Sequence, residues 1–169
     1  LQPSARRRGV ALFSPGDELV MSGTVAPQDM KPGAIYNSNR FFLRALLTRL
    51  GCEVSDLGIV PDNRAATLAA LQSAAHGHDL ILTSGGVSVG EEDHIKPAVE
   101  QLGALDLWQI AMKPGKPFAY GHVRRGEGDA AHFMGLPGNP VSSFVTFLLL
   151  VRPFLLKLQG ATALAPAAM

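Results

Sequence analysis

Short runs of apolar residues alternate along the chain with segments in which apolar residues recur every three or four positions. A short apolar run bounded by glycine or proline is typical of a buried strand, and the wider spacing is typical of an amphipathic helix. Strands are expected over residues 9–14, 53–60, 79–86, 107–112, 116–121 and 130–138. Helices are expected over residues 38–51, 64–77, 95–103 and 140–157, the last interrupted at Pro153.

The alternation of strand and helix predicts the α/β class, with a mostly parallel sheet covered by helices on both faces in three α/β/α layers. Residues 1–7 are expected to form a tail or linker, residues 8–160 one domain, and residues 161–169 a linker toward a further C-terminal domain. Ser38 or Asn39 is expected to cap the first helix, and Asp62 stands where a cap of the second helix belongs.

Composition and charge exclude several classes of protein. The 169 residues are 47% hydrophobic and 17% charged with a formal net charge of +1, so a globule that does not bind nucleic acid is expected. The single cysteine, Cys52, opens an apolar strand and is expected to be buried in a cytoplasmic protein. The most apolar stretch, residues 141–151, is about half the length that spans a bilayer, so no membrane partner is expected.

Polar residues gather where the predicted strands end. The motifs SPGDEL, PDN, SGGVSVGEED, KPGKP and LPGNPVSS each follow a strand. In an open α/β sheet the ligand binds beyond the carboxyl ends of the strands. One edge of the sheet is therefore expected to collect Asp17, Glu18, Asp62, Glu91, Glu92, Asp93, Lys113, Lys116, Asn139, Ser142 and Ser143.

The glycine loop after the third strand resembles a phosphate-binding loop without its lysine. Gly85 and Gly90 have the G-x-x-x-x-G spacing, but Glu91 and Glu92 stand where that loop has Lys and then Ser or Thr. The glycines either turn the chain or bring its backbone close to a ligand. The acids either favour the dipole of the helix that follows or hold a metal ion, and carboxylates beside a phosphate suit Mg²⁺.

Two further motifs are candidate anion sites. KPGKP fixes a non-helical loop in which Lys113 and Lys116 can face one anion. In GNPVSS, Asn139 is placed as an N-cap with Pro140 at the first helical position, so the motif is either a plain helix cap or a cradle of free N–H groups. Asp62 likewise either caps a helix or serves the site. The five histidines lack zinc-site spacing, and the sequence has no G-x-S-x-G elbow.

Six motifs occur in the order that is found in the molybdopterin-binding domain of the MoeA family, the molybdopterin molybdotransferases. They are SPGDEL, IYNSNR, LGIVPDN, SGGVSVGEEDHIK, KPGKPFAYG and GLPGNPVSS. This resemblance covers residues 8–160 and implies the fold shared with MogA and MoaB. It also implies molybdenum cofactor biosynthesis: insertion of molybdate into adenylylated molybdopterin with release of AMP in a Mg²⁺-dependent step. A homodimer and a MogA-like partner are implied as well.

Carried over motif by motif, the resemblance implies three overlapping sets of site residues. Glu18, Asp62, Asp93 and Lys113 would be catalytic. Asp17, Glu18 and Asp93 would hold Mg²⁺. The substrate would lie against Gly85, Gly86, Ser88, Lys116, Pro137, Gly138, Asn139 and Ser142.

The chain departs from the MoeA pattern at several points. Asn37 stands where the family often has Asp, and Gln109 stands where relatives commonly carry Lys or Arg, which weakens one metal contact and one anion contact. Full-length MoeA has additional domains, so the chain resembles an excised central domain. Two alternatives stay open: a MogA-like molybdopterin adenylyltransferase, and a ligand-binding or scaffold domain without turnover.

Overall fold

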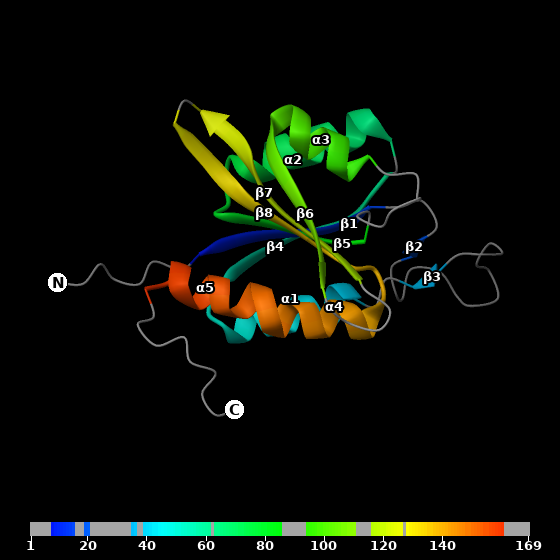
Figure 1. The fold of residues 1–169 in the computed structure, drawn as a ribbon, viewed down its shortest axis with the longest axis vertical. Helices are drawn as coiled ribbons and strands as arrows, with labels where there is room; N and C mark the ends of the chain where they lie inside the picture. The colour runs from blue at the N-terminus through cyan, green and yellow to red at the C-terminus, as the bar shows by residue number, and fades with distance from the viewer. Residues whose placement is uncertain are drawn as a thin grey trace.

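A computed structural model describes residues 8–15, 19–20, 35–36, 39–61, 63–85, 94–110, 116–126 and 128–160. Within them a six-stranded sheet has the order β4-β1-β5-β8-β7-β6 (Figure 1). Its strands are β1 Gly9–Pro15, β4 Glu53–Val60, β5 Leu80–Ser84, β6 Gly103–Ile110, β7 Lys116–Gly126 and β8 Asp129–Leu136. β1, β4, β5 and β8 are parallel to one another, and β7 is antiparallel to both β8 and β6. The predicted mostly parallel sheet is confirmed.

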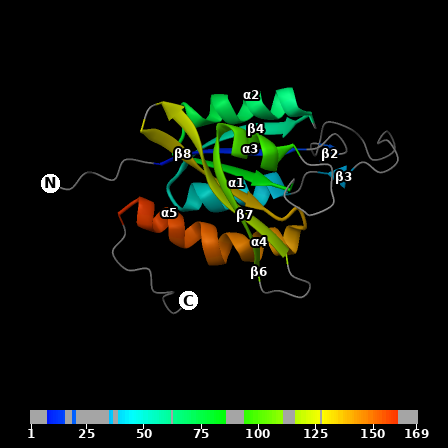
Figure 2. The same cartoon turned by 45° about the horizontal axis from the view of Figure 1, so that its top comes forward.

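Helices cover both faces of this sheet, as the alternating sequence pattern predicts (Figures 1 and 2). They are α1 Asn39–Arg49, α2 Arg64–Ala75, α3 Ile95–Leu102, α4 Pro140–Thr146 and α5 Arg152–Leu158. In β1, Ala11 and Phe13 share a core with α2 and α3, whereas Val10 and Leu12 share a core with α1 and α5. Successive side chains of a strand point to opposite faces, so a strand covered on both sides has a continuous apolar sequence.

The last helix is interrupted immediately before Pro153, as its sequence predicts. α4 passes into a π-helical segment, η2 Phe147–Val151, which passes into α5. The Arg152 N–H donates to the Phe147 carbonyl oxygen, five residues back, and Pro153 has no N–H to continue the ladder. One extra residue is thereby accommodated without breaking the helix.

The continuous helix Pro140–Leu158 is long and apolar enough to cross a membrane, judged by length and composition. The expectation considered residues 141–151 alone, and the helix extends beyond them at both ends. In the fold, Phe147, Val151 and Leu155 are buried against the sheet, and Val141 and Leu149 are exposed. The helix is held to the domain along one side.

Three strand regions differ from the prediction. β6 begins at Gly103 and ends at Ile110, whereas a strand was expected over residues 107–112. β2 Leu19–Val20 pairs with β3 Ile35–Tyr36 in a separate small sheet, in a region expected to be loop. β7 continues to Gly126, beyond the expected end at residue 121, and forms a hairpin with β8. The extension was missed because buried Val123 stands between exposed His122 and Arg124, so no apolar run marks it.

Asn63, and not Asp62, caps α2. The Asn63 Oδ1 accepts the Ala66 N–H at 2.8 Å, which satisfies a donor that the helix itself leaves without a partner. The capping alternative for Asp62 is therefore wrong, and Asp62 itself lies outside the described residues. Asn39 lies within the first turn of α1, so the cap position there falls on Ser38, which is also outside them.

Candidate functional site

Six strand ends meet along one edge of the sheet. Parallel β1 and β4 end as a pair at Pro15 and Val60, and parallel β5 and β8 end as a pair at Ser84 and Leu136. β6 ends at Ile110 beside the first residue of β7. We call this the carboxyl edge. All the segments that carry the predicted site motifs begin or end there.

The segments predicted to carry charge follow different strands of the sheet. Asp62 follows β4, Asp17 and Glu18 follow β1, and the acids at 91–93 follow the glycine loop after β5. Lys113 stands in the β6–β7 connection, beyond β8. The predicted site segments thus all adjoin the carboxyl edge, and the side chains of these acids and of Lys113 lie outside the described residues.

Most side chains predicted for the site lie outside the described residues, and their contacts stay predictions. They are Asp17, Glu18, Asp62, Gly86, Ser88, Asp93 and Lys113, together with Asn37, Glu91 and Glu92. Lys116 opens β7, but the structure describes only its backbone. The described members of the predicted site are Gly85, Pro137, Gly138, Asn139 and Ser142.

The turns after β5 and β8 touch each other through glycine. Gly85 has φ +91°, a left-handed conformation that favours glycine, and its N–H donates to the Leu136 carbonyl oxygen at 2.9 Å. A Cβ placed on Gly138 would lie 3.6 Å from the Gly85 Cα. The two backbones thus run against each other with no side chain between them.

Asn39, at the start of α1, joins these two turns. Its Nδ2 donates to the Ser84 Oγ at 2.6 Å and to the Gly138 carbonyl oxygen at 2.9 Å. The residue is 7% exposed. Sequence reasoning considered Asn39 only as a helix cap, because its partners are 45 and 99 residues away along the chain.

Asn139 caps α4 with its own side chain. Its Oδ1 accepts the Val141 N–H at 3.0 Å and the Ser142 N–H at 3.1 Å, and its carbonyl oxygen accepts the Ser143 N–H at 2.8 Å. The predicted cradle of free N–H groups is therefore wrong here, and the capping alternative is confirmed. Ser142 is buried, and its contact with substrate stays a prediction.

The start of α3 bears on the three acids that precede it. The helix begins at Ile95 with His94 in the cap position, and its first turn contains no acidic residue. Glu91, Glu92 and Asp93 lie outside the described residues, so both alternatives for them, the helix dipole and a metal ion, stay predictions.

The donor chemistry predicted for this edge fits Mg²⁺. β1 and β5 are neighbouring strands, with Phe13 paired to Thr83, so the segments that carry Asp17, Glu18 and Asp93 belong to adjacent strands. Carboxylate oxygens are the ligands that Mg²⁺ prefers. Within the described part of the chain, no three His, Cys, Asp or Glu side chains are grouped to hold a metal ion.

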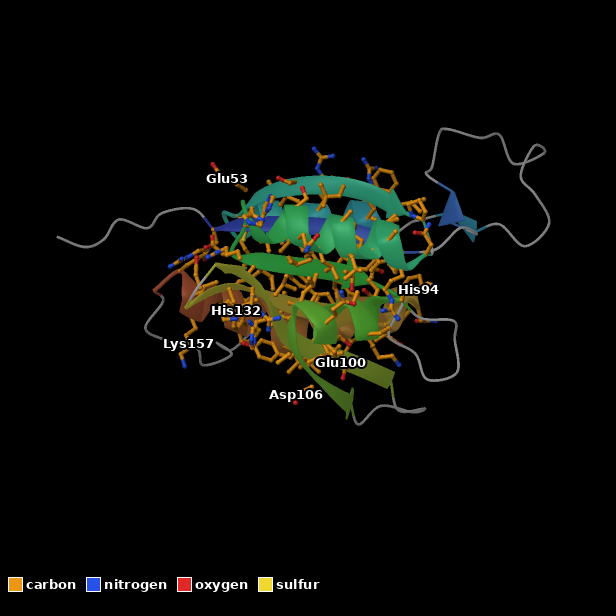
Figure 3. The ribbon with its side chains drawn as sticks, turned by 90° about the horizontal axis from the view of Figure 1, so that it is seen from above. Glu53, His94, Glu100, Asp106, His132 and Lys157 are labelled. Atoms are coloured by element: carbon orange, nitrogen blue, oxygen red, sulfur yellow. The ribbon has the colours of Figure 1, made fainter. Side chains whose placement is uncertain are left out.

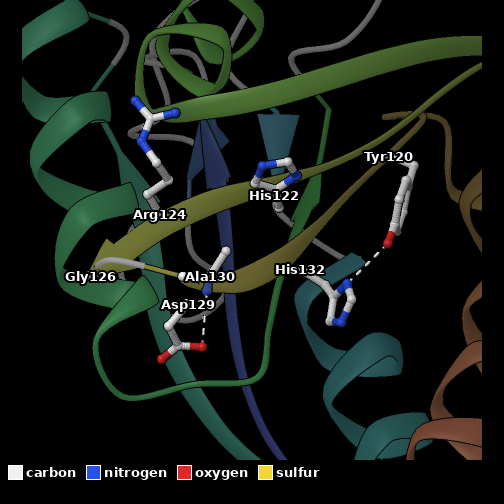
Figure 4. A pocket seen from close by; sticks show the side chains of 8 residues that line it. Tyr120, His122, Arg124, Gly126, Asp129, Ala130 and His132 are labelled. Carbon is white, nitrogen blue, oxygen red and sulfur yellow. Dashed lines mark hydrogen bonds between the residues drawn. The ribbon is translucent and has the colours of Figure 1, made fainter.

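A separate open concavity of about 440 Å³ lies on the β7–β8 hairpin, away from the carboxyl edge (Figure 4). Its lining includes Tyr120, His122, Arg124, Asp129 and His132, none of which was predicted for the site. The Tyr120 hydroxyl and the His132 Nδ1 are 3.0 Å apart. Burial, the main cause, lowers the pKa of His132 below its ordinary value. The concavity therefore presents a neutral imidazole and no predicted motif.

Cys52 is buried at 4% exposure, as predicted. Desolvation raises the pKa of its thiol, and the charge of Asp79 raises it further. Such a thiol stays protonated and is a poor nucleophile, so Cys52 serves the hydrophobic core.

Comparison with known proteins adds independent information. A family model described as "Probable molybdopterin binding domain" matches residues 11–157. The chain is 49% identical over 155 residues to a molybdopterin molybdenumtransferase of Haemophilus influenzae, and 39% identical over 156 residues to one of Nostoc. These alignments cover 92% of this chain but only 36% and 34% of the relatives. The chain thus spans about a third of the length of the curated relatives it matches.

Solved structures confirm the predicted fold. A molybdopterin biosynthesis MoeA protein from Pyrococcus horikoshii superposes with a TM-score of 0.76 at 32% identity, over 94% of this chain and 37% of that one. A tungsten cofactor synthesizing protein, MoaB from Pyrococcus furiosus, superposes with a TM-score of 0.66 at 15% identity, over 94% of this chain and 99% of that one. At that identity the second likeness is one of fold alone.

Proposed function

Because this chain belongs to the family of molybdopterin-binding domains, we propose that it is the molybdopterin-binding domain of a molybdopterin molybdenumtransferase in molybdenum cofactor biosynthesis. Residues 8–160 form this domain. The enzyme inserts molybdate into adenylylated molybdopterin and releases AMP. The 49% identity to a molybdenumtransferase favours this activity over adenylyl transfer, for which the likeness to MoaB offers only the fold.

One observation supports the proposal: two glycine turns touch at the carboxyl edge, where the segments with the predicted acidic and basic site residues begin or end. A substrate with phosphate groups needs cations on one side. A metal ion that neutralises those groups needs carboxylates on the other. The backbone contact between Gly85 and Gly138 leaves the boundary between the two sides without side chains, so a flat ligand can approach closely.

In this proposal each segment has a distinct role. Lys113 and Lys116 bind the phosphate or molybdate oxygens, because an ammonium group is a compact positive charge with hydrogen bonds to donate. Gly85, Gly86 and Ser88 lie against the pterin phosphate, with Pro137, Gly138, Asn139 and Ser142 across the boundary. Asp17, Glu18 and Asp93 would hold Mg²⁺, which when bound neutralises the charge that develops on the leaving phosphate. Glu18, Asp62, Asp93 and Lys113 orient the reacting groups.

The cellular setting follows from the same chemistry. Adenylylated molybdopterin and molybdate are the proposed partners of the site, and we place the protein in the cytoplasm. A homodimer and an association with a MogA-like protein belong to the proposal as well, since handing over a labile adenylylated substrate directly would protect it from hydrolysis.

Replacement of Lys113 by alanine tests the basic side. A hydrogen bond to a charged group contributes about 1.5–3 kcal/mol, so the affinity of the chain for adenylylated molybdopterin should fall about 10- to 100-fold. Isothermal titration calorimetry measures this change. Added salt should weaken wild-type binding in the same assay.

Lys157→Ala is the matched control, because it removes the same charge from α5, which carries no predicted site residue. Figure 3 shows Lys157 far from His94, the residue that follows Asp93. This variant should bind like the wild type. Unchanged affinity of Lys113→Ala would remove the KPGKP loop from the site, and failure of the wild-type chain to bind would refute the proposed function.

A further inference from the structure

Asn39 makes a connection at the carboxyl edge that the sheet itself does not supply. The β5–β8 ladder ends at the pair Ser84 and Leu136, and the bond from the Gly85 N–H to the Leu136 carbonyl oxygen extends it by one step. Beyond that point Gly85 and Gly138 bring the two turns into contact. The Asn39 amide bridges them there, because it binds Ser84 on one turn and Gly138 on the other.

The orientation of the Asn39 amide follows from its partners. A backbone carbonyl oxygen only accepts hydrogen bonds, so the amide nitrogen must face Gly138. The same nitrogen has a second hydrogen, which it donates to the Ser84 Oγ. The Asn39 Oδ1 is then buried on the other side of the group without a hydrogen-bond partner among the described residues. Asn39 therefore acts at this position through the two hydrogens of its amide nitrogen.

We propose that Asn39 is a positioning residue: it fixes the turn after β5 against the turn after β8, so that both turns face one ligand. A bound substrate would span both turns, and a shift of about 1 Å between reacting groups can cost about 100-fold in rate. The consequence for ligand binding rests on the proposed function. The clamp itself, by which we mean the hydrogen bonds from Asn39 to Ser84 and Gly138, does not rest on it.

Neither aspartate nor alanine can replace Asn39 in this role. An ionised aspartate has the same shape but no hydrogen to donate, and its charge would face the Gly138 carbonyl oxygen. Alanine removes the bridge and leaves a cavity. Ser84→Ala removes one partner of the bridge and keeps the bond to Gly138, so it should have a smaller effect than either change at Asn39.

The first experiment measures the clamp without any ligand. In Asn39→Asp, amide hydrogen exchange at Gly85, followed by NMR, should accelerate at least tenfold at neutral pH. The Asp79 amide, which donates to the Gly9 carbonyl oxygen at 2.8 Å at the other end of the sheet, should exchange as in the wild type. Asn63→Asp adds the same charge and keeps its helix cap, and it controls for charge alone. Unchanged exchange at Gly85 in Asn39→Asp would overturn the clamp.

The second experiment measures binding of adenylylated molybdopterin as a function of pH. The introduced carboxyl group can donate a hydrogen bond only when it is protonated. The affinity of Asn39→Asp relative to the wild type should therefore be at least tenfold lower at neutral pH and should recover on acidification. Asn39→Ala should bind weakly at every pH. If Asn39 has a purely structural role, the affinity of each variant relative to the wild type should not change with pH.

The outcomes separate this inference from the proposed function. Faster exchange at Gly85 together with unchanged affinity would overturn the positioning role and keep the clamp. Absence of wild-type binding would refute the proposed function, and the exchange experiment would still decide the clamp. If Asn39→Ala fails to fold, Asn39→Asp and Ser84→Ala still decide the question, with thermal melting as the check that each variant is folded.

Discussion

Substitution of Gly85 by alanine tests whether the turn after β5 depends on a left-handed backbone. Gly85 has φ +91°, and this region costs an ordinary L-residue roughly 1–2 kcal/mol. Packing adds little to that cost, because the new Cβ would lie 3.8 Å from the Gly138 Cα, an ordinary contact distance. For a chain of this size, 1 kcal/mol corresponds to about 2–4 °C in the melting temperature, so a fall of about 2–8 °C is expected.

Differential scanning calorimetry of Gly85→Ala and Gly77→Ala measures the effect against a matched control. Gly77 follows α2, has no left-handed φ, and a Cβ there would meet nothing within 4 Å. Its replacement should leave the melting temperature unchanged or raise it slightly, because alanine restricts the unfolded chain. Equal melting temperatures for the two variants would show that the turn relaxes without cost, and the strain reasoning would be refuted.

Two further predictions concern stability. Asn63→Ala should lower the free energy of unfolding by about 1 kcal/mol in urea denaturation, because the Ala66 N–H loses its cap. Asn63→Asp should keep most of the wild-type stability, because its carboxylate can still accept that N–H. An equal loss of stability in both variants would contradict the capping assignment. Burial holds the pKa of His132 below its ordinary value of 6.5, so its contribution to stability is present above pH 6.5 and is lost as the pH falls through the lowered pKa. The melting temperature should therefore fall less on acidification for His132→Gln than for the wild type. An identical fall in both proteins would exclude His132 as a cause of the acid destabilisation.

The sequence predicts the buried elements of the fold well, because burial on both faces leaves a continuous apolar run. β1, which is buried at residues 10–14, was predicted within one residue of its observed bounds. The prediction failed where a strand is open to solvent, as in the outer part of the β7–β8 hairpin. It also failed for β2 and β3, because strands of two residues are too short to show any periodicity.

The location of the site at one edge of the sheet could be predicted from the sequence, because parallel strands bring their carboxyl ends together whatever side chains they carry. The local roles were harder to predict. Asp62 and Asn63 are neighbours, and both are good caps, so only the fold decides which one faces the Ala66 N–H. The bonds of Asn39 join residues distant in sequence, and no local pattern marks such a contact.

The location of a bound phosphate tests the central claim most directly. A crystal structure of the chain with AMP and Mg²⁺ should place the phosphate at the carboxyl edge, between the turns at Gly85 and Gly138 and within reach of Lys113, with the cation on the side of Asp93. A phosphate bound instead in the hairpin concavity, against His122 and Arg124, would contradict the account.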